Sequence, residues 1–188
     1  MFERERFVEE CRAALTDANP HAAVKEVVER AVAAPGDVTT ALGVPTKAGI
    51  EVLHRAADLT VLNVAWAPKM SIYPHDHQTW AVIGIYGGQE DNSFYRRRKE
   101  GIGLEQVNGR SLLEKEAIAL GDQVVHGVTN PRRAFTAAIH VYGGDFFAIP
   151  RSEWDSPEAA EQPYSVERAL QTFEEANRRI EELLRADS

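Results

Sequence analysis

The chain of 188 residues has a single cysteine, Cys11, and no apolar run long enough to cross a membrane. One cysteine excludes an internal disulfide, which fits a reducing compartment. The first six residues are mostly charged and lack the apolar stretch of a signal peptide. We therefore expect a cytoplasmic protein without a membrane partner, in which Cys11 is a buried apolar residue.

Positive charge is also scarce, because 21 Lys and Arg face 29 Asp and Glu and the formal net charge is −8. Binding to a phosphate backbone needs clustered basic side chains, so the composition argues against a nucleic-acid partner. The one basic run, residues 96–99, is interpreted as the solvated end of a hairpin. A hydrophobic content of 44% suffices for one core, which predicts a single domain over residues 1–188, monomeric or homodimeric.

Three zones follow one another along the chain. Apolar residues recur at helical spacing near the start and are divided by Asn19-Pro20, which predicts a helical cap of two helices within residues 1–40. Pro35-Gly36-Asp37 predicts a turn. Residues 50–150 contain short β-runs broken by Gly, Pro and Asp, typical of an antiparallel barrel. Apolar residues roughly one turn apart predict a C-terminal helix over residues 165–185.

Three histidines suggest a metal site. His75 and His77 are separated by one residue, so on a strand both side chains face the same side, and His126 follows 49 positions later. Neutral imidazoles suit Fe, Zn, Cu or Ni, and three of them leave coordination positions open for substrate or oxygen. If the barrel closes, the three predict a catalytic metal centre. The alternative is a pair of histidines on a solvent-facing strand.

The sequence around these histidines resembles the two cupin motifs. The first motif begins with His75-Asp76-His77, and the second ends in the H-x3-N pattern of His126 and Asn130. The resemblance implies an all-β core, the antiparallel double-stranded β-helix barrel of cupins, with helices at both ends of the chain. Ala81 and Val82 stand where many cupins carry a glutamate ligand, so the resemblance favours a three-histidine site.

Within the cupins, residues 59–151 resemble the thiol dioxygenases, the cysteine and 3-mercaptopropionate dioxygenase group, and are closest to an uncharacterised bacterial branch. These enzymes hold non-haem Fe(II) with three histidines beside a Ser-x-His-x-Tyr relay. Here His140 and Tyr142 match the relay, and Ala138 replaces its serine. The alternative for His140 is a core histidine. Val82 stands where the mammalian enzyme has its cross-linking cysteine, so no cross-link is expected.

The resemblance implies an Fe(II) dioxygenase that oxidises a small carboxylate-bearing thiol, of the cysteine or 3-mercaptopropionate type, to its sulfinate with O2. Tyr142 and His140 would be catalytic. Arg151, a short distance after the relay tyrosine, would bind the carboxylate, with Arg55 as second choice. Trp80 is a candidate lining residue of the substrate pocket. The alternatives are surface arginines and a tryptophan of the barrel core.

Two other functions stay open. A cupin metalloenzyme with the same histidines could act on a non-thiol substrate, as an isomerase or a carbon–carbon-cleaving dioxygenase. The replacement of the relay serine by Ala138 also leaves open a metal- or small-molecule-binding cupin without turnover. Glu90 and Asp91, just past a glycine pair, are interpreted as solvated or capping residues without a catalytic role.

Overall fold

The computed structural model describes the backbone of residues 1–186 and the side chains of residues 1–182. Its elements follow in the order α1 (Arg4–Ala14), α2 (Pro20–Val32), α3 (Pro35–Leu42), β1 (Gly49–Arg55), β2 (Leu59–Trp66), β3 (Ser71–Asp76), β4 (Ala81–Gly87), β5 (Gln89–Arg97), β6 (Leu104–Leu113), β7 (Ala117–Leu120), β8 (Val125–Thr129), β9 (Thr136–Gly143), β10 (Ser152–Glu153), β11 (Gln162–Pro163) and α4 (Val166–Ala186).

The strands form two antiparallel sheets with the orders β1-β2-β9-β4-β7 and β11-β10-β3-β8-β5-β6. Without the short or peripheral strands β1, β10 and β11, each sheet has four strands. The chain then crosses from sheet to sheet at every step except the β5–β6 hairpin. This order is that of a jelly roll, the double-stranded β-helix of cupins. The predicted fold class is therefore confirmed.

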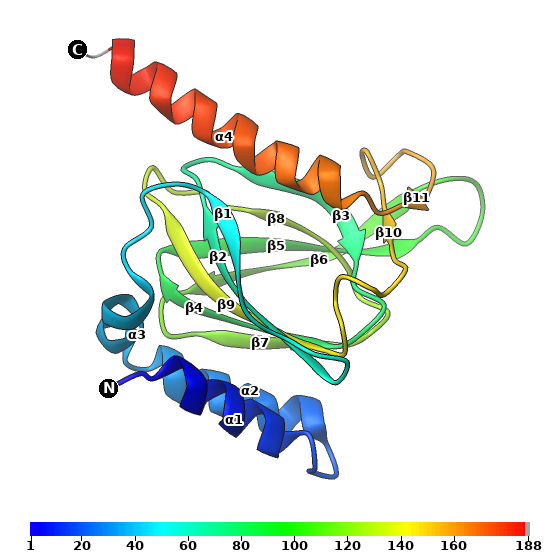
Figure 1. Cartoon of the computed structure of the whole chain (residues 1–188). Helices are drawn as coiled ribbons and strands as arrows, with labels where there is room; N and C mark the ends of the chain where they lie inside the picture. Colours follow the sequence, from blue (N-terminus) through cyan, green and yellow to red (C-terminus); the bar gives the residue numbers. More distant parts are fainter. Residues whose placement is uncertain (187–188) are drawn as a thin grey trace.

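The N-terminal helices pack on the outer face of the five-stranded sheet, below the barrel in Figure 1. Val28 of α2 meets Val82 of β4 and Val141 of β9 in one buried cluster. At Gly84 the helix comes so close that an added Cβ would lie 2.4 Å from the Val28 Cγ1 atom. Cys11 is fully buried in the same cluster, and burial raises its pKa to about 12, so it behaves as an unreactive apolar residue.

A third helix begins where the sequence predicted a turn. Pro35 is the first residue of α3, and its fixed φ suits the first helical turn, where its missing N–H is not needed. The helix ends at Gly43, whose φ of +86° a residue with a side chain rarely adopts. The prediction of two N-terminal helices was therefore one helix short.

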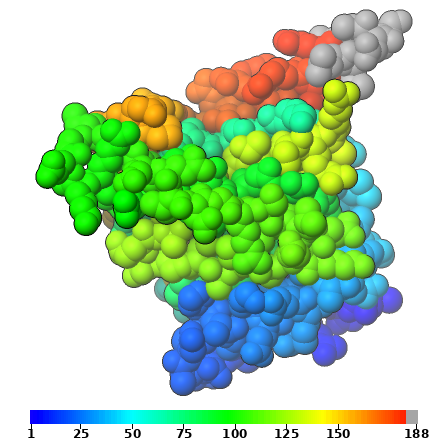
Figure 2. All heavy atoms as spheres, turned by 180° about the vertical axis from the view of Figure 1, so that it is seen from behind, coloured from blue at the N-terminus to red at the C-terminus, as the bar shows by residue number. Residues whose placement is uncertain are grey.

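The C-terminal helix α4 lies on the opposite side of the barrel from α1 and α2, as Figures 1 and 2 show from two sides. Its buried residues Ala169, Phe173 and Ala176 complete the inner core between the two sheets. Phe173 stacks on Trp66 of β2 with ring centroids 5.3 Å apart. None of the described helices is long and apolar enough to span a membrane.

Candidate metal centre

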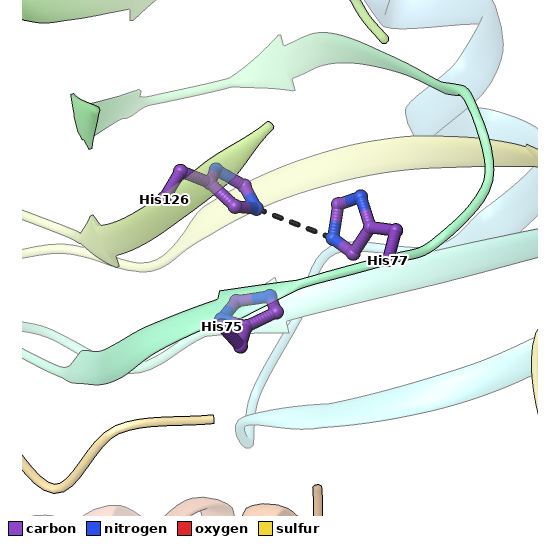
Figure 3. A group of neighbouring side chains, drawn as sticks. All are labelled: His75, His77 and His126. Atoms are coloured by element: carbon purple, nitrogen blue, oxygen red, sulfur yellow. Dashed lines mark hydrogen bonds between the residues drawn. The ribbon is translucent and has the colours of Figure 1, made fainter. Parts of the chain in front are cut away.

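The structure brings together the three histidines that the sequence singled out (Figure 3). His75 lies on β3, His77 directly follows that strand, and His126 lies on β8 opposite His75. One nitrogen from each of the three lies within 4.8 Å of the other two, and the Nε2 atoms of His77 and His126 are 3.2 Å apart. All three side chains are buried, so the alternative of a solvent-facing pair does not hold.

The residue between His75 and His77 points away from them, as the alternation of an extended chain predicts. Asp76 is fully buried, and its carboxylate accepts hydrogen bonds from the Arg97 guanidinium and the Ser152 amide, both at 2.8 Å. Arg97 also pairs with Glu161 and lies over the Trp154 ring. The basic run is therefore not simply a solvated hairpin end, because Arg97 anchors the strand that carries His75.

Hydrogen bonds orient two of the three imidazoles for metal binding. The Nδ1 atom of His75 lies 3.0 Å from the carbonyl oxygen of Tyr73, and the Nδ1 atom of His126 lies 2.7 Å from Oδ1 of Asn92. Since these oxygens only accept, each Nδ1 donates its proton and each Nε2 carries a lone pair, which in His126 faces Nε2 of His77 at 3.2 Å. Such partners fix the tautomer and the ring orientation of metal ligands.

Burial keeps the three imidazoles neutral. Desolvation lowers the pKa of His75 to about 4 and holds the pKa values of His77 and His126 well below the usual range. Only a neutral imidazole has a lone pair for a metal. Three converging neutral nitrogens with oriented rings fit a first-row transition metal such as Fe, Zn, Cu or Ni.

A small cavity of about 40 Å³ lies inside the barrel beside the histidines. Its walls come from both sheets, from Tyr164 and from Phe173 of α4. Most lining side chains are apolar or aromatic, and the polar ones are the three histidines together with His140, Tyr142 and Tyr164. The cavity therefore suits a reactant of few atoms.

His140 and Tyr142 line this cavity together from β9. The Tyr142 hydroxyl lies 2.9 Å from Nδ1 of His140, and its ring meets the edge of His77 at 5.1 Å between centroids. Burial raises the pKa of Tyr142 well above its usual range, so the phenol keeps its proton. Ala138 is fully buried two residues before His140 and offers no hydroxyl.

Arg151 is a buried cation that does not itself line this cavity; it lies behind the cavity wall and lines a separate surface pocket. Its guanidinium is sandwiched between the rings of Phe146 and Tyr164, at 3.9 and 4.1 Å from their centroids, and both rings line the cavity. Nη1 donates to the Phe146 carbonyl oxygen, whereas the buried Nε has no hydrogen-bond partner. Among the described side chains, no carboxylate lies within ion-pair distance of Arg151.

Arg55 and Trp80 lie elsewhere. Arg55, half exposed at the end of β1, makes a two-pronged ion pair with Asp145 at 2.8 and 3.0 Å. Trp80 stacks on His21 and packs with the outer core under the N-terminal helices. Neither side chain lines the cavity with the three histidines.

Glu90 departs from its interpretation as a solvated or capping residue. The side chain is fully buried, and its carboxylate accepts hydrogen bonds from Trp66 Nε1 at 2.9 Å and from Asn92 Nδ2 at 3.0 Å. Asn92, the partner of His126, was not predicted from the sequence either. Alternation along the strand offered a signal, because Glu90, Asn92 and the apolar Phe94 share one face.

Asn130 and Val82 serve the fold. The Asn130 amide donates to three backbone carbonyl oxygens, of Trp66, Ala67 and Ala134, and so holds the loop after β8. Val82 belongs to the outer core, and Ala81 is the β4 residue paired with Tyr142. The β4 position beside Tyr142 is therefore occupied by Ala81 and not by Val82.

No protein-family model and no curated protein matches the sequence. Solved structures with a similar fold include an RmlC-like cupin family protein with a double-stranded β-helix from Methanocaldococcus jannaschii. It is 9% identical with a TM-score of 0.45, over 55% of this chain and 85% of that one. A Bacillus halodurans protein is 15% identical with a TM-score of 0.48, over 57% and 76% of the two chains. KdgF from Halomonas sp. is 16% identical with a TM-score of 0.42, over 54% and 82%. The strand order, and not these likenesses, carries the fold assignment.

Proposed function

We propose that the protein is a non-haem Fe(II) dioxygenase that oxidises a small carboxylate-bearing thiol, of the cysteine or 3-mercaptopropionate type, to its sulfinate. The observation that carries the proposal is the buried, unpaired Arg151 next to a three-histidine site that adds no negative charge. A cation without a counter-ion in a protein interior is costly. A substrate carboxylate would supply that counter-ion.

The reaction balances without a further reductant. A thiolate and O2 combine to a sulfinate, so sulfur loses four electrons, O2 gains four, two sulfur–oxygen bonds form and the bond of O2 breaks. Bound Fe(II) would supply a Lewis acid that lowers the thiol pKa and a redox centre for O2. His75, His77 and His126 would hold it as neutral ligands, and its uncompensated charge favours an anionic substrate.

Arg151, behind the cavity wall, and the residues of the cavity would position the reactants. Arg151 has a free Nε–H for a carboxylate, and the planar guanidinium suits bidentate binding. Tyr142 retains its proton and lies against His77, so its hydroxyl can hydrogen-bond a reactant beside the metal ligands. Phe146, Phe173 and the apolar walls exclude water from the reacting sulfur.

Oxygen consumption by anaerobically Fe(II)-loaded protein tests the proposal. Cysteine, 3-mercaptopropionate, mercaptosuccinate and cysteamine are offered in parallel, and sulfinate is followed by mass spectrometry. We expect oxygen uptake equal to sulfinate formed with at least one carboxylate-bearing thiol. Cysteamine, which lacks a carboxylate, should react more slowly than the best of the other three.

Two outcomes would contradict the proposal. Protein that keeps its iron but consumes no oxygen with any thiol would favour a non-thiol substrate or a binding role. Equal turnover of cysteamine and the carboxylate-bearing thiols would remove the role assigned to Arg151.

A further inference from the structure

Glu90 is a buried carboxylate that lies between the metal ligands and the Tyr142–His140 pair. One oxygen, Oε1, accepts from Nδ2 of Asn92, and the other, Oε2, accepts from the indole N–H of Trp66. Oε2 also lies 3.6 Å from Nε2 of His140, a buried atom with no hydrogen-bond partner. The groups around Glu90 are thus donors or can act as donors, which suits an ionised carboxylate that only accepts.

The first consequence concerns the metal ligand His126. Because Glu90 only accepts, Asn92 must turn its NH2 group toward Glu90 and its Oδ1 toward His126. His126 then carries its proton on Nδ1, and its Nε2 lone pair is free for a metal. Glu90 therefore determines the tautomer of His126 by orienting the Asn92 amide that lies between them.

The second consequence concerns the relay. A carboxylate next to Nε2 of His140 favours the tautomer with the proton on Nε2. Nδ1 of His140 is then an acceptor and takes the hydrogen bond of the Tyr142 hydroxyl at 2.9 Å. Carboxylate, imidazole and hydroxyl stand in the order of a catalytic triad. The Tyr142 oxygen can then still accept a hydrogen bond from a reactant in the cavity.

We propose that Glu90 is a positioning residue that sets the tautomers of both His126 and His140. The inference rests on the metal site of the proposed function and not on the identity of the substrate. One buried carboxylate would thus determine which nitrogen of His126 can bind a metal. It would also determine that Tyr142 donates, and His140 accepts, the hydrogen bond between them.

The substitution Glu90→Gln tests the proposal because a glutamine has only one accepting oxygen. It cannot accept both from Asn92 on one side and from Trp66 and His140 on the other. If its NH2 faces Asn92, the Asn92 amide turns over and His126 loses its Nδ1 acceptor. If its NH2 instead faces Trp66 and His140, the proton of His140 moves to Nδ1. Asp91→Asn is the matched control, since it makes the same chemical change one residue away, where the carboxylate accepts from Gln89.

Two measurements distinguish these two orientations of the glutamine amide. Proton–nitrogen correlation spectra of 15N-histidine-labelled, Zn(II)-loaded protein report the tautomer of His140, and competition with a chelator reports Zn(II) affinity. We expect an Nε2 proton on His140 in the wild type and in Asp91→Asn. In Glu90→Gln we expect either an Nδ1 proton on His140 or a Zn(II) affinity about 10- to 100-fold lower.

Clear results would overturn the proposal: an Nδ1 proton on His140 in the wild type, or a Glu90→Gln protein with unchanged tautomer and affinity. Tyr142→Phe decides the case in which Glu90→Gln does not fold. The Nε2 proton of His140 should persist in Tyr142→Phe if Glu90 sets it, and its loss would contradict us. Neither readout uses a thiol, so failure of the proposed reaction is distinguishable from failure of this inference.

Discussion

At the scale of single residues, unpaired polar groups around the cavity indicate where a reactant would bind. Arg151 and His140 each have a buried nitrogen without a hydrogen-bond partner. Buried polar groups are nearly always hydrogen-bonded, so such exceptions need an explanation. For His140 the carboxylate of Glu90 is 3.6 Å away, whereas no carboxylate of the described chain lies within ion-pair distance of Arg151. Arg151 is therefore the residue at which an external anion matters most.

Replacing Arg151 by Gln should raise the KM for 3-mercaptopropionate about 10- to 100-fold, because a hydrogen bond to a charged group contributes about 1.5–3 kcal/mol. The KM for cysteamine should change little. Arg151→Lys, which keeps the charge and loses the fork, should fall between the two. Steady-state oxygen uptake gives the KM values of the wild type and both variants. An equal rise in KM for 3-mercaptopropionate and cysteamine would exclude a carboxylate contact.

The buried histidines predict a pH dependence for the metal-free protein. The pKa of His75 is about 4 in the folded chain and about 6.5 when unfolded, so below pH 6.5 the unfolded state binds a proton that the folded state does not. The stabilisation is complete above pH 6.5 and is lost as the pH falls toward 4, by on the order of 3 kcal/mol for this group.

Urea unfolding at pH 7.5, 6 and 5 in the presence of a chelator measures this dependence. The decline should be shallower in His75→Gln than in the wild type, since the variant lacks one of the groups that titrate. Parallel declines in the two proteins would show that His75 does not contribute.

At the scale of elements, the strand that carries His75 depends on its contacts with neighbouring segments. Asp76 joins β3 to Arg97 at the end of β5 and to Ser152 of β10. On the other side of the strand, His75 is paired with His126 of β8. The three histidines are thus held by segments far apart in sequence, and loss of the Asp76 contacts on one side of β3 should disturb His75 on the other side.

Replacing Arg97 by Gln should lower the free energy of unfolding by about 1.5–3 kcal/mol, because a buried carboxylate loses a charged hydrogen-bond partner. The metal affinity should fall as well. Arg96→Gln is the control, since the Arg96–Glu105 pair is exposed and contributes about 1 kcal/mol or less. Urea titrations give both energies, and equal effects would show that Arg97 does not anchor the strand.

At the scale of the whole molecule, the five-stranded sheet separates two buried clusters. The outer one joins this sheet to α1, α2 and α3, and the inner one lies between the sheets and is completed by α4. The three-histidine group belongs to the inner region, where Phe173 of α4 also lines the cavity. A metal ion held by these three histidines would bind the folded chain and not the unfolded one, so metal binding should raise the free energy of unfolding.

Zn(II) or Fe(II) at 100 times its dissociation constant should stabilise the wild type by about 2.7 kcal/mol. For a chain of this size that corresponds to a rise in Tm of roughly 5–10 °C. His126→Ala should lose this rise in Tm because only two of the three candidate ligands remain. His54→Ala, which changes a histidine of β1 outside the site, should keep it. Thermal unfolding with and without metal tests this, and a full shift in His126→Ala would refute the ligand assignment.

The sequence by itself determined the local features. The spacing of His75 and His77, the alternation of the strands, the capping Asn19 and the apolar faces of the helices depend on neighbours two to four residues away. For that reason the β-core, the terminal helices and the candidate ligands could be predicted. The start of α3 was missed, because Pro35 suits both a turn and a first helical turn.

Only the tertiary structure decided which distant residues meet. Asn92 reaches His126 because β5 pairs with β8, and Arg151 stacks on two rings of the cavity wall because the chain after β9 folds back toward it. Glu90 looked like a residue of a glycine turn, yet the sheet turns it inward beside Trp66 and His140. Strand order and register are long-range choices that no local periodicity contains. They place one buried carboxylate, Glu90, and one buried guanidinium, Arg151, near the three histidines.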